Sequence, residues 1–173
     1  RAAKLINSFK EIAVDQSSEV SREINVKEYI EEILISMRPI LKKLPHEILI
    51  ECTDCLYIET IPGAIAQVLT NMINNSIIHG FDSTKKGTIT ITAQLEDKAL
   101  NLTYQDDGKG LNEEEQKMLF EPFYTTKRGN GGSGLGTHLI YNLVTSTLSG
   151  KITNDSEPMQ GLTYKMVIPS PLQ

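Results

Sequence analysis

The sequence has no tryptophan, only 6% aromatic residues and fewer basic than acidic side chains. Its 17 Lys and Arg residues stand against 22 Asp and Glu, which gives a formal net charge of −5 over 173 residues. Proteins that bind nucleic acid usually present a basic face or an aromatic platform on which bases stack. We therefore expect no nucleic-acid partner.

Long apolar runs are also missing. No segment approaches the roughly 20 apolar residues that a membrane-spanning helix needs, so we expect no membrane contact by this chain and a cytoplasmic location. The length suits one folded domain with a short appendage. Because the chain opens on Arg1 and not on Met, we expect it to be a piece of a longer protein, whose other segments can include a membrane anchor.

Cysteine is scarce, with one C-x-x-C pair at Cys52 and Cys55. A structural zinc site needs about four ligands, and the three histidines are not spaced as a second ligand pair. A thioredoxin-like site requires the motif to open a helix, whereas residues 56–59 have the pattern of a strand. Two free thiols are the expectation, as is usual in a reducing compartment.

Hydrophobic periodicity predicts the elements of the fold. Apolar residues recur at helical spacing in segments 1–15, 26–43, 62–78, 113–119 and from 136 to about 148. Strand patterns occur at 47–52, 56–59, 88–95, 100–104, 151–154 and 162–168. Their order predicts an α+β fold, a two-layer α/β sandwich in which about three helices cover one face of a mixed sheet of about five strands. Within it, Asn25 is the expected N-cap of the second helix.

One polar stretch lies on a predicted helix, and another follows a predicted strand. Asn71 and Asn75 are spaced i, i+4, so they lie on the same side of one helix. Their amide oxygens suit Mg²⁺, which takes its other ligands from phosphates and water; the alternative is an ordinary solvated helix face. In D-x-G-x-G, which starts at Asp106, the glycines let the backbone pass close to a planar ligand, and the carboxylate can accept a proton from an exocyclic amine. An ordinary Asp-Gly turn is the alternative there.

Two further stretches could meet an anion. The segment F-E-P-F-Y-T-T-K-R brings Lys127 and Arg128 next to the glycine-rich residues 129–136. Exposed backbone N–H groups in a glycine loop that leads into a helix are suited to phosphate. The loop satisfies G-x-G-x-x-G, but it follows no strand, so a dinucleotide-binding βαβ unit is not expected.

In their order and spacing, N-x-x-x-N, D-x-G-x-G, F-x-P-F with T-T-K, and G-G-S-G-L-G resemble the N, G1, F and G2 boxes of the sensor histidine kinase ATP-binding domain. The resemblance covers roughly residues 24–170 and implies the Bergerat-type ATP-binding fold. It also implies that residues 1–23 are the end of a dimerisation-domain helix with its linker, and that 24–173 are the catalytic domain.

The resemblance implies a role for each matching position. Asn75 would ligate Mg²⁺, and Asp106 would recognise the adenine of ATP or ADP. Asn71 and Lys127 would be the catalytic residues. The remaining nucleotide contacts would come from His79, Gly108, Gly110, Leu111, Thr126, Ser133, Gly134, Leu135, Gly136 and Thr163.

Two positions depart from the family pattern. The family usually has Thr directly after the glycine of its last box, where this chain has Leu162, so adenine recognition is assigned to Thr163. Many members have Lys or Arg three residues after the Mg²⁺-binding Asn, where this chain has Ile78. His79, which follows Ile78, is the candidate for that phosphate-side role, with a simple helix-end histidine as the alternative.

The function implied is ATP-dependent transfer of the γ-phosphate to a histidine on the dimerisation domain of the same kinase, whose acceptor helix is expected outside this chain. A response regulator or phosphotransfer protein would act downstream, and the full-length kinase is expected to be a homodimer. One alternative is an anti-sigma-factor serine kinase; that family usually carries Glu where this chain has Asn71. The other is a non-catalytic nucleotide-binding module.

Overall fold

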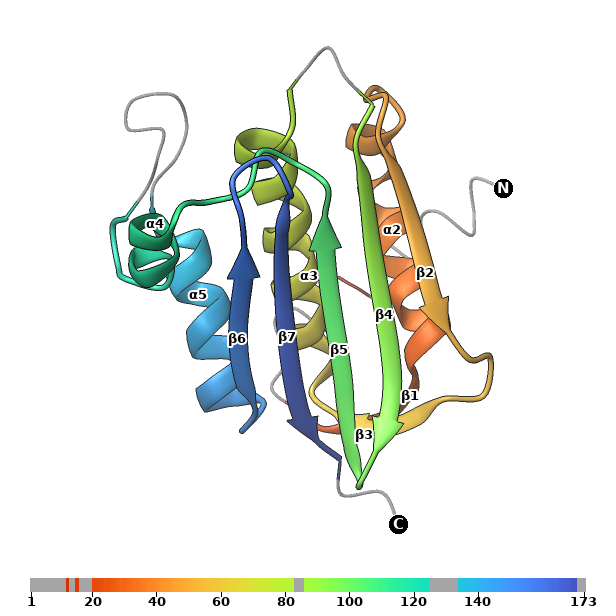
Figure 1. Cartoon of the computed structure of the whole chain (residues 1–173). Coiled ribbons are helices and arrows are strands. Elements are labelled where there is room, and N and C mark those ends of the chain that lie inside the picture. The colour runs from red at the N-terminus through yellow and green to blue at the C-terminus, as the bar shows by residue number, and fades with distance from the viewer. Residues whose placement is uncertain (1–11, 13–14, 16–19, 83–85, 125–133, 171–173) are drawn as a thin grey trace.

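The computed structural model describes residues 12, 15, 20–82, 86–124 and 134–170, and shows two layers (Figure 1). One layer is a five-stranded sheet in the order β2-β4-β5-β7-β6. β2 pairs with β4 in parallel and the other pairs are antiparallel. The strands are β2 (Glu47–Cys52), β4 (Thr88–Glu96), β5 (Ala99–Asp106), β6 (Lys151–Ser156) and β7 (Leu162–Pro169).

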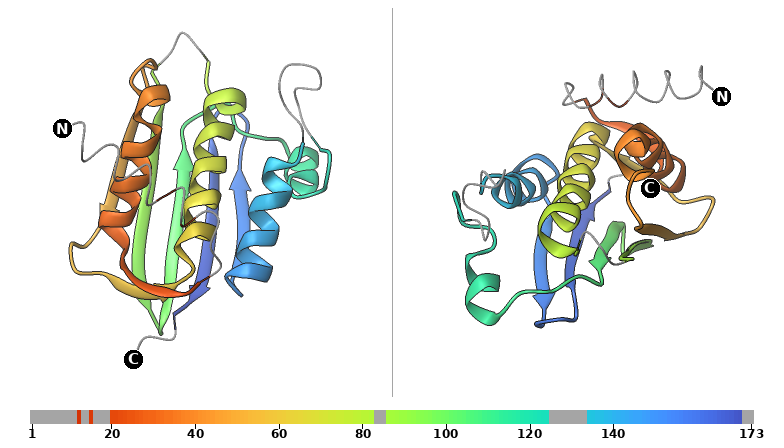
Figure 2. Two further views of the ribbon diagram at one scale, coloured as in Figure 1. Left: turned by 180° about the vertical axis from the view of Figure 1, so that it is seen from behind. Right: turned by 90° about the horizontal axis from the view of Figure 1, so that it is seen from above.

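The second layer is helical and covers one face of the sheet (Figure 2). It contains α2 (Val26–Leu41), α3 (Pro62–Asn75) and α5 (Gly136–Asn142), while the short α4 (Glu113–Met118) lies at the β6 side. The predicted α+β sandwich with a mixed sheet and one helical layer is thus confirmed.

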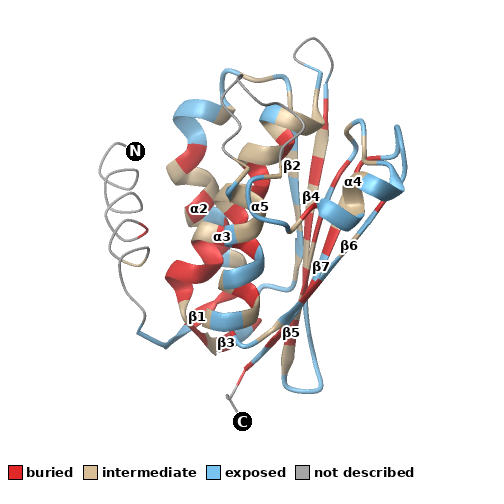
Figure 3. Ribbon diagram, turned by 90° about the vertical axis from the view of Figure 1, so that its left-hand side faces the viewer, coloured by how far each residue is buried: buried red, intermediate tan, exposed pale blue. Residues whose placement is uncertain are grey.

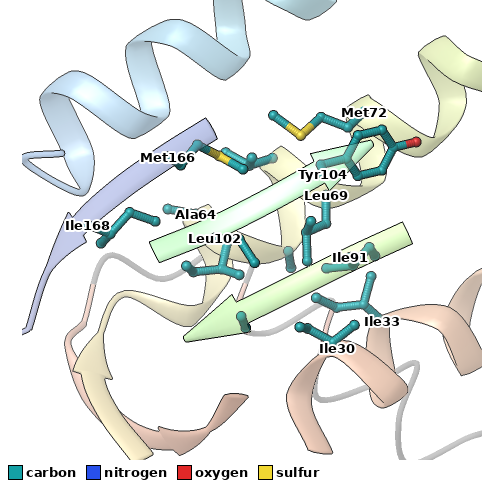
Figure 4. Packing of buried hydrophobic residues seen from close by; sticks show 14 of the residues in the cluster. Ile30, Ile33, Ala64, Leu69, Met72, Ile91, Leu102, Tyr104, Met166 and Ile168 are labelled. Atoms are coloured by element: carbon teal, nitrogen blue, oxygen red, sulfur yellow. The ribbon is translucent and has the colours of Figure 1, made fainter. Parts of the chain in front are cut away.

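The core lies between the two layers, where the buried sides of the helices face the sheet (Figure 3). Alternation along β5 sends Leu100, Leu102 and Tyr104 inward, and each is at most 1% exposed. The apolar stripe of α3 packs over them, with Leu69 and Met72 fully buried (Figure 4). The buried apolar side chains repeat every two residues along the strands and about every 3.6 residues along the helices. Both kinds of element were therefore predictable from the sequence.

Two helices continue as wider, π-helical turns. α3 passes into η1 (Ser76–Gly80), and α5 passes into η2 (Leu143–Thr147). The sequence pattern predicted one regular helix over 62–78. The wider turn of η1 changes which side chains face the sheet after Asn75, and such turns are frequent at functional sites.

A second, two-stranded sheet was not predicted. β1 (Arg22–Asn25) pairs antiparallel with β3 (Tyr57–Thr60). The strands expected at 47–52 and 56–59 therefore both form, but in different sheets. β1 gave no signal because it has four residues and one apolar side chain, Ile24, too few to show an alternation. The strand also spans the expected domain boundary between residues 23 and 24.

The predicted N-terminal helix lies mostly outside the described residues. Ile12 and Asp15 are described, and both are helical. Ile12 is buried, and the Asp15 carboxylate accepts hydrogen bonds from the Arg22 guanidinium (2.8 Å) and the Tyr29 hydroxyl (3.0 Å). Asp15 therefore contacts the start of the domain, and Ile12 is part of the buried core.

Two expectations about the cysteines and the membrane can be compared with the described part of the chain. Cys52 and Cys55 are both free thiols, as predicted. None of the helices within the described ranges has both the length and the apolar character needed to cross a bilayer.

Asn25 joins the small sheet to α2, and we predict that it stabilises the fold through both ends of its amide. Its Oδ1 accepts from the Glu28 N–H (3.2 Å), the predicted N-cap, and its Nδ2 donates to the Asp54 carbonyl (2.7 Å). Asn25→Ala should lower the free energy of unfolding by about 1–2 kcal/mol. Asn25→Asp, which keeps the acceptor and loses the donor, should lose less. Urea unfolding followed by circular dichroism measures both; an unchanged Asn25→Ala variant would contradict the assignment.

Candidate functional site

A cleft of about 240 Å³ opens beside the helical layer, where α3 and η1 meet the end of β5, the start of α5 and the start of β7. It gathers residues from four of the stretches singled out in the sequence. The lining residues are Asn71, Met72, Asn74, Asn75, Ser76, Ile78, His79, Gly80, Asp106, Lys109, Gly110, Leu111, Leu119, Tyr124, Gly134, Gly136, Thr137, Leu162 and Tyr164.

The carboxylate of Asp106, which is 4% exposed, lies in the cleft at the end of β5. Its Oδ2 accepts a hydrogen bond from Ser76 Oγ (2.6 Å). Its Oδ1 accepts from the backbone N–H groups of Gly108 (3.0 Å) and Leu162 (3.3 Å). Burial raises the pKa of Asp106; the three hydrogen bonds lower it, and burial is the larger effect.

Ser76 is a site residue that the sequence interpretation missed. It is 3% exposed, and its hydroxyl lies 2.8 Å from the Tyr104 hydroxyl as well as bonding Asp106. Ser76 continues the apolar stripe of α3 one turn beyond Met72 and Ile73. A polar residue on a buried stripe needs a buried partner, and that was the available signal.

Two glycines allow the chain segments to approach closely beside Asp106. Gly161 has φ +80°, and a Cβ there would lie 1.8 Å from the Asp106 carbonyl oxygen. Gly110 has φ +65°, and its Cβ would lie 2.0 Å from the carbonyl oxygen of Glu157. Any side chain would force these segments apart. Gly108 borders the same place, since a Cβ on it would lie 2.6 Å from the Gly80 carbonyl oxygen.

Asn71 and Asn75 lie together at the start of α5, as their spacing predicted. A Cβ on Gly136 would lie 3.4 Å from Asn75 Oδ1 and 3.6 Å from Asn71 Oδ1. Asn71 Nδ2 donates to the Gln67 carbonyl (2.8 Å), which directs its oxygen the other way. Asn75 Nδ2 is buried and has no hydrogen-bond partner among the described residues.

The segment between the F and glycine-rich stretches lies largely outside the described residues, and with it the predicted site residues Thr126, Lys127 and Ser133. Its two ends are described and are tied together: the Phe123 N–H donates to the Gly134 carbonyl (3.0 Å). Gly134 lines the cleft, whereas Leu135 precedes α5, is 44% exposed and is not a lining residue.

His79 and Leu111 line the cleft, but Thr163 does not. Leu162 and Tyr164 on either side of Thr163 do line it, and successive side chains of a strand point to opposite faces. Thr163 is therefore on the face of β7 away from the helices. The family motif has its Thr at the position of Leu162. Assigning that role to Thr163, one residue further along β7, places it on the opposite face of the strand. Tyr164 and the Leu162 N–H are the β7 groups that the sequence interpretation missed.

Comparison with known proteins gives concordant matches. Residues 60–172 match the family described as histidine kinase-, DNA gyrase B- and HSP90-like ATPases. Sporulation kinase A of Bacillus subtilis (strain 168) is 28% identical over 175 residues, which cover 98% of this chain and 27% of that kinase. The chain thus spans about a quarter of the length of that relative.

Two other matches bear on the alternatives. The anti-sigma F factor of Bacillus velezensis is 31% identical over 102 residues, covering 59% of this chain and 65% of that protein. The solved catalytic domain of the histidine kinase ThkA superposes with a TM-score of 0.76 at 26% identity, covering 87% of this chain and 96% of that domain.

The raised pKa of Asp106 predicts a pH-dependent loss of stability. Because its folded-state pKa lies above the ordinary value of 3.8, ionisation costs more in the folded than in the unfolded chain. The protonated Asp106 side chain therefore favours the folded state. Its contribution to stability is complete below the ordinary pKa and is lost as pH rises through the folded-state pKa. Asp106→Asn should therefore gain stability relative to wild type as pH rises from the acid limit toward neutrality.

Urea unfolding of both proteins at a series of pH values measures this difference. Ser76→Ala removes a hydrogen bond that lowers the pKa of Asp106. In this variant the pH-dependent decrease in the free energy of unfolding should therefore extend to higher pH. A wild-type minus Asp106→Asn difference that stays constant across the series would contradict the prediction.

Proposed function

The chain belongs to the family of histidine kinase-, DNA gyrase B- and HSP90-like ATPases, and we propose that it is the ATP-binding catalytic domain of a two-component sensor histidine kinase. The observation that carries the proposal is the buried, hydrogen-bonded Asp106 carboxylate in a cleft lined by the matched motifs. The likeness to sporulation kinase A and to the ThkA catalytic domain supports a kinase.

Asp106 would recognise the base of the nucleotide. An ionised carboxylate has about four lone-pair positions, and three protein donors already use three of them. One acceptor position is left for an exocyclic amine such as that of adenine. The glycine backbones around Asp106 leave room for a flat ring, because they carry no Cβ; a Cβ at Gly80 would be in van der Waals contact with Asp106 Oδ2, at 3.5 Å.

Asn75 fits a Mg²⁺ ion that is held mainly by phosphates. The described residues contain no group of three or more His, Cys, Asp or Glu side chains that could hold a metal by themselves. Asn75 is a neutral amide whose Nδ2 has no hydrogen-bond partner among the described residues, and its Oδ1 suits an ion that takes its remaining ligands from phosphate and water. Bound there, Mg²⁺ would neutralise charge on the phosphates, while Asn71 and Lys127 position the terminal phosphate.

The acceptor of the γ-phosphate would be a histidine of the kinase's dimerisation domain. Attack of an imidazole nitrogen on the γ-phosphorus forms the N–P bond and breaks the bond to the β,γ-bridging oxygen, releasing ADP. Two of the chain's own histidines have structural contacts: His46 Nδ1 accepts from the Gly87 N–H (3.1 Å), and His138 Nδ1 bonds the Phe120 carbonyl (3.1 Å). We assign residues 1–23 to the end of that dimerisation domain and its linker.

The setting of the domain is the cytoplasmic side of a homodimeric kinase that passes phosphate to a response regulator or phosphotransfer protein. A second candidate is a serine kinase of the anti-sigma factor type, which the match to anti-sigma F factor favours. Asn71 argues against it, because an amide at that position cannot serve as the general base that a carboxylate supplies.

Removal of the Asp106 charge should strongly weaken nucleotide binding. We expect Asp106→Asn to weaken ADP binding by about one hundredfold, the upper range for a hydrogen bond to a charged group. Asp107→Asn is the matched control, because it removes the same charge one residue away, from an exposed side chain outside the cleft. Its amide oxygen can still accept from the Thr88 N–H, as the carboxylate does at 2.7 Å. Isothermal titration calorimetry with Mg·ADP decides; equal losses in both variants would refute the assignment.

Phosphotransfer should require a second domain. The chain with Mg·ATP alone should incorporate no acid-labile phosphate. Addition of a separately supplied dimerisation domain should yield phosphohistidine on that domain, and none on its His→Gln variant. Acid-labile label on the chain itself would contradict the proposal, and acid-stable phosphoserine on an added substrate protein would favour the anti-sigma alternative.

A further inference from the structure

Two tyrosines lie directly opposite each other in the sheet, and only one has its hydroxyl satisfied. Tyr104 of β5 pairs with Tyr164 of β7, and both are at most 1% exposed. The Tyr104 hydroxyl lies 2.8 Å from Ser76 Oγ and so joins the Asp106 network. The Tyr164 hydroxyl is buried and has no hydrogen-bond partner among the described residues.

A buried hydroxyl without a partner is costly, so it requires an explanation. Tyr164 lines the cleft and lies on the same face of β7 as Leu162, whose N–H donates to Asp106 Oδ1. The Tyr164 side chain therefore borders the same cleft as the Asp106 carboxylate. Burial and the nearby Asp106 carboxylate raise the pKa of Tyr164, so the hydroxyl stays protonated and is a donor.

The other β7 side chains cannot supply a donor at this place. Leu162 is apolar, and Thr163 is on the opposite face of the strand. If Asp106 accepts from the exocyclic amine of adenine, the neighbouring ring nitrogen N1 is an acceptor that needs a donor. Tyr164 offers a donor in the same cleft as Asp106.

We propose that the Tyr164 hydroxyl is a base-recognition group that donates a hydrogen bond to N1 of adenine. This inference rests on the proposed function, since it requires a nucleotide in the cleft. It adds a donor to the acceptor supplied by Asp106, so that both polar positions on that edge of the base are read.

Tyr164→Phe tests the inference, because it removes only the hydroxyl. Binding of Mg·ADP, measured by calorimetry, should weaken about tenfold, while the nucleotide-free protein should unfold at the same or a higher temperature. The matched control, Tyr104→Phe, removes a satisfied hydroxyl and should lower the unfolding temperature. A base analogue, 1-deaza-ADP, which has C–H in place of N1, gives the second measurement. Wild type should bind 1-deaza-ADP about tenfold more weakly than it binds ADP. Wild type and Tyr164→Phe should bind 1-deaza-ADP with equal affinity.

Each outcome separates this inference from the function on which it depends. If wild type fails to bind ADP, the proposed function fails. If wild type binds ADP and Tyr164→Phe binds it equally well, only the role of Tyr164 is refuted. A hydroxyl satisfied by a structural water would instead give a less stable Tyr164→Phe protein with unchanged ADP affinity, which also overturns the inference. Should Tyr164→Phe not fold, equal affinity of wild type for ADP and 1-deaza-ADP still refutes it.

Discussion

The rest of the cleft depends on the need to satisfy one buried carboxylate. Asp106 ends β5, and its donors come from η1, from the loop after β5 and from the start of β7. A buried charge is tolerated only when it is hydrogen-bonded, so these three segments must converge. The register of the sheet places Leu162 opposite Asp106. The cleft is therefore assembled only when β5 and β7 pair in the correct register.

The same helix builds the core and the polar wall of the cleft. α3 buries Leu69 and Met72 against the sheet, and carries Asn71 and Asn75 toward the start of α5. Ser76, one helical turn beyond Met72, then reaches the carboxylate of Asp106. Because core and cleft share these residues, a ligand that binds the folded cleft would stabilise the whole domain, by an amount that grows with the ligand concentration relative to its Kd.

Sequence periodicity predicted most of this fold, because the strands alternate and the helices carry continuous apolar stripes. It failed where an element was too short to show a period, as in β1, and where only pairing decides the sheet, as for β3. For the cleft, motif spacing identified Asp106 and the two asparagines. It could not identify Ser76 or Tyr164, because the burial of their hydroxyl groups is evident only in three dimensions. It assigned Thr163 to the site, although one step along a strand reverses the face and Thr163 points away from the cleft.

One backbone contact sets how far the neighbouring sequence is free to vary. The hydrogen bond from Phe123 to Gly134 holds together the two ends of the segment between them. Because this bond joins two backbone atoms, it is the backbone shape at its two ends that must be kept. Gly134 has φ +68°, and a Cβ there would lie 2.6 Å from the Phe123 carbonyl carbon, so only glycine suits that end.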